Sequence, residues 1–195
     1  YTVTITDSSV VSSALNTLDG KTTVAVDAAA ITTLTGSAAD ANTAYASNGI
    51  AGLGNEAVTL NETSLASSVL NTLDGNTTGA VNAATVTTLT GLAADANTAY
   101  ASNGITGLGN EAVTLSDTSL ATTVLNTLDG NTTGAVNAAT VTTLTGTAAT
   151  ANTAYASNGI TGLGDEAVTI SDTSLATTVL NTLDGNTTGA VNAAT

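Results

Sequence analysis

The sequence predicts a right-handed parallel α/β solenoid with two βα coils in each repeat of 55 residues. Three observations lead to this fold class. The chain repeats itself almost letter for letter, and within a repeat short β-branched runs alternate with stretches of helical period. Its apolar residues are mainly Ala, Val and Leu, which suit the narrow interior of a coil. Consecutive strands of such a chain are expected to pair in parallel through right-handed crossovers.

Tandem repetition divides the chain into units. The segment "LDGNTTGAVNAATVTTLTG" at 73–91 returns unchanged at 128–146. The predicted units are the end of a preceding repeat at 1–5, a divergent repeat 1 at 6–60, repeat 2 at 61–115, repeat 3 at 116–170 and a partial repeat 4 at 171–195. One repeat is too small to bury its apolar residues alone, so stacking on its neighbours is expected to stabilise it. Both termini fall inside a repeat, which favours an excerpt of a longer repetitive chain over ends that neighbouring molecules cover.

The first coil of a repeat begins with a strand. One such strand is "AVTL" at 112–115, where repeat 2 passes into repeat 3, a β-branched run with alternating polarity. The next residues, "SDTSLATTVLNTLDGN", predict a helix because their large apolar side chains fall on one helical stripe. That stripe consists of Leu120, Val124, Leu125 and Leu128. Asp117 or Thr118 is expected to cap the first turn, and Gly130 is expected to end the helix.

The second coil follows the same plan. "GAVNAATVTTLTG" predicts extended structure with a strand near 140–144. "TAATANTAYASNG" predicts an Ala-rich helix that starts near Thr145 or Thr147 and ends at a left-handed Asn158 or Gly159. "ITGLGDEAVTI" then returns to a strand. Each of the two βα steps takes about 27 or 28 residues. An all-β solenoid is the alternative, because Thr and Val are poor helix formers.

Composition excludes several functions. Fifteen acidic residues accompany a single basic one, Lys21, and the net charge is −14. Binding to nucleic acid or to anionic membranes needs Lys and Arg, so neither partner is expected. No run of 18 apolar residues predicts membrane insertion. The chain has no His or Cys, and its Ser residues have no base beside them, so we expect no enzyme activity and no cofactor.

Two further residue types recur once per repeat. Asp27, Asn82, Asn137 and Asn192 stand at the bend before a strand, where stacked side chains are expected to bond backbone groups from coil to coil. Tyr45, Tyr100 and Tyr155 are the only large side chains of the repeated part, and each is expected to pack as a rung with its hydroxyl at the surface.

The motif "DGNTTG" copies the opening of a calcium loop, in which alternating oxygens face one ion. The candidate metal ligands are Asp74, Asn76, Thr78, Asp129, Asn131, Thr133, Asp184, Asn186 and Thr188. The pattern is incomplete, since Thr140 stands where a bidentate Glu is expected, and repeat 1 has Lys21 and Val24 within the motif. The alternative is a helix-ending turn in which Asp and Asn bond the local backbone. These departures favour the turn.

The stretch "VNAATVTTLTG…ANTAYASNGITGLGNEAVTLSDTSLATTVLNTLDGNTTG" resembles tandem repeats of giant secreted or surface proteins of aquatic bacteria, including cyanobacteria. The resemblance covers essentially every residue and is specific for a type of repeat, so it transfers no functional residues. It implies an extracellular or cell-surface region, a stiff rod or fibre building block of a filament, surface layer or adhesin, that associates with copies of itself end to end or side by side. The alternative is a binding or adhesion module, calcium-stabilised in one version, that recognises glycan or another surface.

Overall fold

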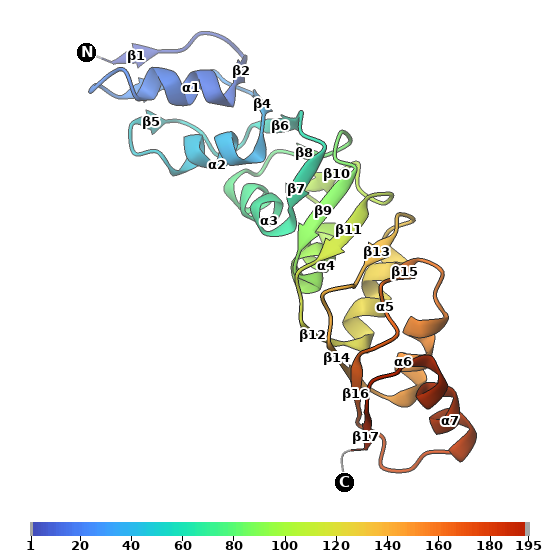
Figure 1. The fold of residues 1–195 in the computed structure, drawn as a ribbon. Coiled ribbons are helices and arrows are strands. Elements are labelled where there is room, and N and C mark those ends of the chain that lie inside the picture. The colour runs from blue at the N-terminus through green and yellow to red at the C-terminus, as the bar shows by residue number, and fades with distance from the viewer. Residues whose placement is uncertain (1, 194–195) are drawn as a thin grey trace. The chain divides into compact units, whose positions relative to one another are not determined.

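The computed structural model describes residues 2–193 and shows parallel strands alternating with helices, so the predicted parallel α/β solenoid is confirmed. The chain forms two units, one of residues 1–87 and 99–108 and the other of residues 88–98 and 109–195. Strands and helices alternate along the ribbon of each (Figure 1). Helices are present in both units, and the all-β alternative is therefore wrong.

The first unit contains three complete helices and two complete sheets. Its elements are β1 (Val3–Thr4), β2 (Ser9–Val11), α1 (Ser12–Asp19), β3 (Val26–Asp27), β4 (Thr33–Gly36), α2 (Ala38–Ala46), β5 (Ile50–Ala51), β6 (Ala57–Leu60), β7 (Ser64–Ala66), α3 (Ser67–Asn76), β8 (Val81–Asn82) and β10 (Ile105–Thr106). One sheet has the order β1-β3-β5 and the other the order β10-β8-β6-β4-β2, with parallel pairing throughout. α1 packs on α2, and α2 packs on α3.

The second unit repeats this arrangement. Its elements are β9 (Thr88–Gly91), β11 (Ala112–Leu115), β12 (Ser119–Ala121), α5 (Thr122–Asn131), β13 (Val136–Asn137), β14 (Thr143–Gly146), α6 (Ala148–Ala156), β15 (Ile160–Thr161), β16 (Ala167–Ile170), α7 (Thr177–Asn186) and β17 (Val191–Ala193). The strands β15-β13-β11-β9 pair in this order, and β12-β14-β16-β17 form another sheet. α4 (Ala93–Ala101) begins in this unit and ends in the first.

The two coils of a repeat differ in length. Val26 of β3 pairs with Ile50 of β5, so the coil between them takes 24 residues. The remaining 31 residues of the 55-residue repeat form the next coil, which ends at Val81 of β8. The short coil holds β3, β4 and α2, whereas the long coil holds β5, β6, β7 and α3. The prediction of two βα steps per repeat is confirmed, but the steps are unequal because the long coil carries one more strand.

That additional strand corrects the predicted start of the long helix. Leu120 lies in β12 and not in α5, which begins at Thr122. Ser119–Ala121 is extended because it pairs with Thr143–Thr145 of β14, and this ladder overrides the helical period of the local sequence. The strand expected near 140–144 lies at 143–146, and a separate short strand, β13, precedes it.

Helix ends also differ from the prediction. The N-cap of α5 is Ala121, which makes no side-chain cap hydrogen bond, so neither Asp117 nor Thr118 caps this helix. Gly130 lies inside α5, which continues to Asn131. The start of α6 is confirmed, since the Thr147 side chain accepts a hydrogen bond from the Thr150 backbone N–H at 3.1 Å.

The C-terminus of α6 has no left-handed cap. The helix ends at Ala156, and the next residue, Ser157, is extended with φ −71° and ψ 133°. Among the described residues no residue other than Gly has a positive φ, and Gly159 is not among the glycines that do. The expectation for Asn158 and Gly159 is therefore wrong.

The core of each coil is narrow and aliphatic. Leu125 and Leu128 of α5 are fully buried, at 0% exposure. α6 buries Ala148, Ala151 and Ala154, three residues apart on the face toward the core. Because this face is close-packed, a larger side chain there would force the helix away from the sheet. Each fully buried Leu contributes about 1.5–3 kcal/mol, and these contributions accumulate only when coils stack.

Candidate functional site

The interface between successive coils holds most of the side-chain hydrogen bonds that the repeats make. One series joins the helices. The Asn16 side chain in α1 donates to the backbone carbonyl of Asp40 in α2 at 2.9 Å. The Asn42 side chain in α2 donates in turn to the carbonyl of Val69 in α3 at 3.1 Å. In both cases the fifth residue of one helix reaches the third residue of the next.

The same bonds recur in the second unit. Asn126 in α5 donates to the Thr150 carbonyl in α6 at 2.9 Å, and Asn152 in α6 donates to the Val179 carbonyl in α7 at 3.2 Å. This ladder of Asn side chains runs through the helices, and sequence reasoning did not find it. The signal was present, because "LNT" and "ANT" place an Asn at the same position of every helix.

The Asn residues that were expected to stack bond locally. Asn82 Oδ1 accepts from the backbone N–H of Ala84 at 3.0 Å, and Asn137 Oδ1 accepts from that of Ala139 at 3.0 Å. Asp27 makes the same bond in repeat 1. These are turns closed within one coil, so the predicted coil-to-coil role is wrong for these three residues.

Acidic side chains cap the helices of the short coils. Asp172 Oδ2 accepts from the Ala148 backbone N–H, at the start of α6, at 2.7 Å. Asp117 and Glu62 cap α4 and α2 in the same way, at 2.8 and 2.7 Å. Each carboxylate lies 24 residues after the N–H that it caps, and so comes from the following coil. A negative charge is favourable at a helix N-terminus, so these three carboxylates stabilise the helices that they cap.

The candidate calcium ligands bond to three different neighbours. Asp129 accepts from the Ser157 hydroxyl at 2.7 Å, and Asn131 donates to the Asn97 side chain at 2.9 Å. Thr133 donates to the Gly109 carbonyl at 3.3 Å. The other copies repeat these bonds: Asp74 with Ser102, Asn76 with Asn42, Thr78 with Gly54, Asn186 with Asn152, and Thr188 with Gly164.

The local-turn alternative for this motif is also incomplete. Asp129, Gly130 and Asn131 are the last turn of α5, and the first and third of them bond to other coils. Only the Thr132 hydroxyl bonds within the turn, accepting from the Gly134 backbone N–H at 3.0 Å. Within residues 2–193 no group of three or more acidic side chains is placed to hold a metal ion. Calcium binding by "DGNTTG" stays a prediction.

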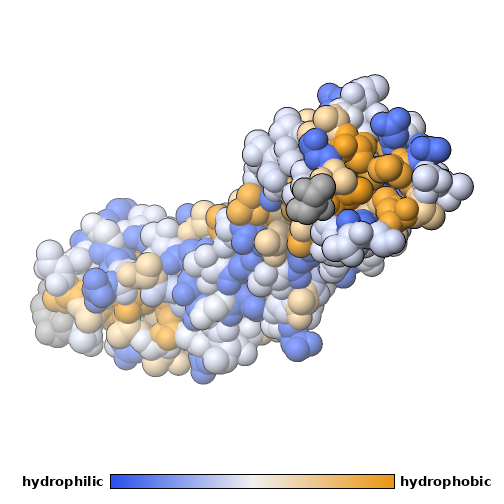
Figure 2. All heavy atoms as spheres, turned by 90° about the horizontal axis from the view of Figure 1, so that it is seen from below, coloured by the Kyte–Doolittle hydropathy of each residue, from blue (hydrophilic) through white to orange (hydrophobic). Residues whose placement is uncertain are grey.

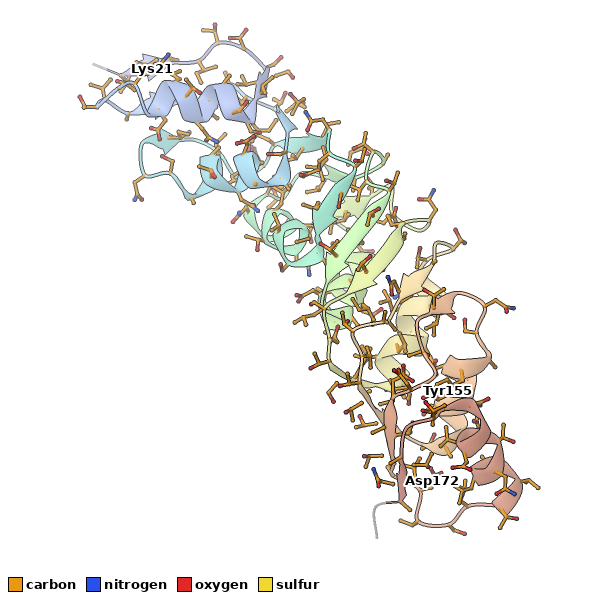
Figure 3. All side chains as sticks on the ribbon, viewed as in Figure 1. Lys21, Tyr155 and Asp172 are labelled. Atoms are coloured by element: carbon orange, nitrogen blue, oxygen red, sulfur yellow. The ribbon has the colours of Figure 1, made fainter. Side chains whose placement is uncertain are left out.

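A buried Glu precedes one long strand in each repeat. Glu56 and Glu166 are fully buried, at 0% exposure. Glu56 Oε2 accepts from the Tyr45 hydroxyl at 3.0 Å and from the backbone N–H of Gly54 at 2.8 Å. Tyr155, which Figure 3 labels, donates to Glu166 Oε2 at 2.9 Å. The Tyr hydroxyls were expected at the surface, and for these two residues that expectation is wrong.

Burial raises the pKa of Tyr45 and Tyr155 above the ordinary value of 10.0, and the neighbouring Glu charge raises it further. The phenols therefore remain protonated and donate to the carboxylates at neutral pH. The second oxygen, Oε1, of Glu56 and of Glu166 is buried without a hydrogen-bond partner among the described residues.

A glycine allows the chain to pass close to this Glu. The Thr132 hydroxyl donates to the Glu111 backbone carbonyl at 2.7 Å. A Cβ atom on Gly134 would lie 2.3 Å from that same carbonyl oxygen. Gly79 and Gly189 are equally close to Glu56 and Glu166. The residue type at this position is thus set by backbone contact between coils, and not by a ligand.

No protein-family model, curated protein or solved structure matches the chain. None of the helices in the described part is long and apolar enough to cross a membrane.

Proposed function

We propose that the chain is a non-catalytic structural repeat region of an extracellular filament, surface layer or giant adhesin, in which it acts as a stiff rod or fibre building block. This proposal rests on one observation, the hydrogen-bond partners of the polar side chains. The Asn side chains of α1, α2, α5 and α6 and the carboxylates of Glu62, Asp117 and Asp172 bond to an adjacent coil. Groups used in this way join coils and are not available to a substrate.

Stiffness follows from the same contacts. Within each unit, neighbouring coils are held together by a β-ladder, by the packing of helices and by side-chain hydrogen bonds. Bending between two coils would have to stretch all three at once. In a linear array of this kind the stability is the sum of repeat and interface contributions, so further repeats extend the region without changing its local structure.

The location and role of the chain can be tested by immunoelectron microscopy. Antibodies raised against the 195-residue chain would be applied to intact, unpermeabilised source cells and to their shed material. We expect regular labelling along filaments or across a surface layer. Labelling confined to the interior of permeabilised cells would contradict the proposal.

A row of exposed polar residues supports the second candidate, a binding module. Thr59, Asn82 and Thr106 are paired across β6, β8 and β10 and are all exposed. Hydroxyl and amide groups at a regular spacing on a sheet can bond sugar hydroxyls. A glycan array would test this candidate: binding that is lost in Thr59→Val, while the fold is kept, would favour adhesion over a purely structural role.

A further inference from the structure

Each short-coil helix is followed by the same turn, Ser-Asn-Gly. Its copies are 47–49, 102–104 and 157–159, and they contain every Asn–Gly bond of the chain. The Asn of each copy is exposed, and its side chain has no hydrogen-bond partner among residues 2–193. Strongly hydrophilic side chains are spread over the face of the molecule that Figure 2 shows. Water therefore reaches three Asn side chains that are each followed by Gly.

An Asn–Gly bond is a site of spontaneous deamidation. The backbone nitrogen of Gly, once it has lost its proton, attacks Cγ of the Asn side chain. A bond from nitrogen to Cγ forms, the bond from Cγ to Nδ2 breaks, and the side-chain amide leaves as ammonia with the Gly proton. Water then opens the five-membered ring to Asp or isoaspartate, which adds one negative charge and needs no oxidant or reductant. Gly favours the attack because it has no Cβ to obstruct the approach.

In this structure the Gly nitrogen of the turn is bonded to Ser. Gly104 donates its backbone N–H to the Ser102 hydroxyl at 2.9 Å, and that hydroxyl donates to Asp74 Oδ2 at 2.7 Å. Asp74 belongs to α3, the helix of the preceding coil. We call Ser102 and Asp74 together a Ser–Asp pair. The other two pairs make the same bonds, Ser47 with Asp19 and Ser157 with Asp129.

The carbonyl of the same Gly is held by the preceding coil as well. Gly104 accepts at its carbonyl from the backbone N–H of Val81 in β8 at 2.8 Å, and Gly159 accepts from Val136 in β13 at 2.8 Å. Ring closure has to turn the peptide plane between Asn and Gly. A Gly that is bonded at both its N–H and its carbonyl resists this rotation.

The Asp carboxylate also opposes the attack through its charge. A Cβ atom on Gly104 would collide with Asp74 Oδ1, so the carboxylate lies directly beside this glycine. Gly49 and Gly159 lie equally close to Asp19 and Asp129. The attacking nitrogen has to become an anion, and a negative charge nearby disfavours a second one.

We propose that Asn48, Asn103 and Asn158 are deamidation sites that stay inert while neighbouring coils are stacked and react when the coils separate. Each Ser–Asp pair is shared between two coils. Local separation of these coils therefore removes the bond from Ser to Asp, the bond from Gly to Val and the adjacent charge in one step.

The product would keep the coils from closing correctly again. In isoaspartate the Cβ atom becomes part of the backbone, so the chain between Asn103 and Gly104 is one atom longer. The Gly104 carbonyl then no longer matches the N–H of Val81. Deamidation at these turns thus marks coils that have separated. This proposal depends on the chemistry of the turn and is independent of the proposed structural role.

Ser102→Ala tests the proposal within a single molecule. The variant removes the Ser–Asp pair beside Asn103 and leaves the one beside Asn158, so the second turn is an internal control. The folded chain is incubated at mildly alkaline pH and cleaved after Glu, which separates the two turns because Glu111 lies between them. Mass spectrometry then follows the deamidated fraction of each peptide. Asn103 should react roughly tenfold faster than Asn158, because both hydrogen bonds of the pair are lost.

Ser102→Thr is the matched control variant, since it keeps the hydroxyl. Thr makes the equivalent turn in the long coils, where the Thr132 hydroxyl accepts from the Gly134 backbone N–H. In this variant Asn103 and Asn158 should react at the same rate. In the wild type, unfolding in guanidinium chloride should accelerate both sites by about tenfold or more relative to the folded chain.

Two results would overturn the proposal: equal rates at Asn103 and Asn158 in a Ser102→Ala variant that circular dichroism shows to be folded, or equal rates in the folded and unfolded wild type. If Ser102→Ala does not fold, the comparison of folded with unfolded wild type decides alone. Neither result would bear on where the protein resides, which the microscopy decides.

Discussion

Residues 116–140 and 171–195 have identical sequences but different surroundings. In the first copy Ser119–Ala121 forms β12, and Leu120 is 7% exposed. In the second copy 174–176 is not a strand, and Leu175 is partly exposed. The helix that follows is the same in both, α5 in one and α7 in the other. A strand that needs a following coil forms only where that coil is present.

The comparison distinguishes two kinds of contact. Backward contacts join a residue to the preceding coil, and forward contacts join it to the following coil. Asp117 and Asp172 both cap a helix of the preceding coil, and Thr132 and Thr187 both bond to the Glu carbonyl behind them at 2.7 Å. The forward bond of Asn126 to Thr150 has no counterpart at Asn181. Identical residues should therefore contribute equally to stability through backward contacts and unequally through forward ones.

The largest difference is expected for Leu125→Ala against Leu180→Ala. Leu125 is fully buried, so its truncation should lower the free energy of unfolding by about 2–5 kcal/mol. Leu180 is partly exposed, and the same truncation should cost less than about 2 kcal/mol. Urea unfolding followed by circular dichroism would measure both. Equal losses would show that the position of a coil in the chain does not set its stability.

A backward contact is tested next by Gly134→Ala and Gly189→Ala. In both, the new Cβ would meet a Glu carbonyl oxygen 2.3 Å away, so each variant should be destabilised by about 1–3 kcal/mol and by a similar amount. Gly130→Ala is the control, because no atom lies within 4 Å of its Cβ position. This control should stabilise α5 by up to about 1 kcal/mol. A marked difference between the stability losses of Gly134→Ala and Gly189→Ala would contradict the distinction between backward and forward contacts.

Asn126→Ala and Asn181→Ala isolate a single forward hydrogen bond. The first should lower the free energy of unfolding by about 1 kcal/mol and the second should change it little. Asn131→Ala and Asn186→Ala remove backward bonds of equal length, 2.9 Å, and should cost the same as each other. The four variants would be compared by thermal unfolding, and a loss at Asn181 as large as that at Asn126 would contradict the comparison.

The smallest effect is expected from Ca²⁺. Both copies contain "DGNTTG", but Asp129 is already bonded to Ser157 and the Asn and Thr of both motifs bond to other coils. Isothermal titration should give no binding heat, and the melting temperature should not rise. Binding heat that disappears in Asp184→Asn would instead locate a calcium site in the last copy.

Residues whose structure depends on their own neighbourhood could be predicted from the sequence. The "AVTL" strand and the Thr147 cap are of this kind, since β-branched alternation and a hydroxyl before an Ala-rich run act locally. Leu120 could not be placed, because its segment matches a helical stripe and becomes a strand only through β14.

The hydrogen-bond partners of the polar residues in the candidate site were still harder to predict from the sequence. Asp117 has the side chain of an N-cap and acts as one, but for a helix that lies 24 residues earlier. Nothing in the spacing along the chain shows that a cap will be supplied from another coil. The same holds for Glu56 and Tyr45, whose bond brings together residues 11 positions apart through the turn after α2.

The carboxylates that cap the short-coil helices have a consequence for synthesis on the ribosome. Ala148 leaves the exit tunnel before Asp172, so α6 emerges with the Ala148 N–H group uncapped and receives this cap only once a further 24 residues have followed. During translation each of the short-coil helices α2, α4 and α6 therefore lacks its carboxylate cap until the next coil has emerged. A pause within that interval would prolong the period in which this helix can unravel or meet a neighbouring nascent chain.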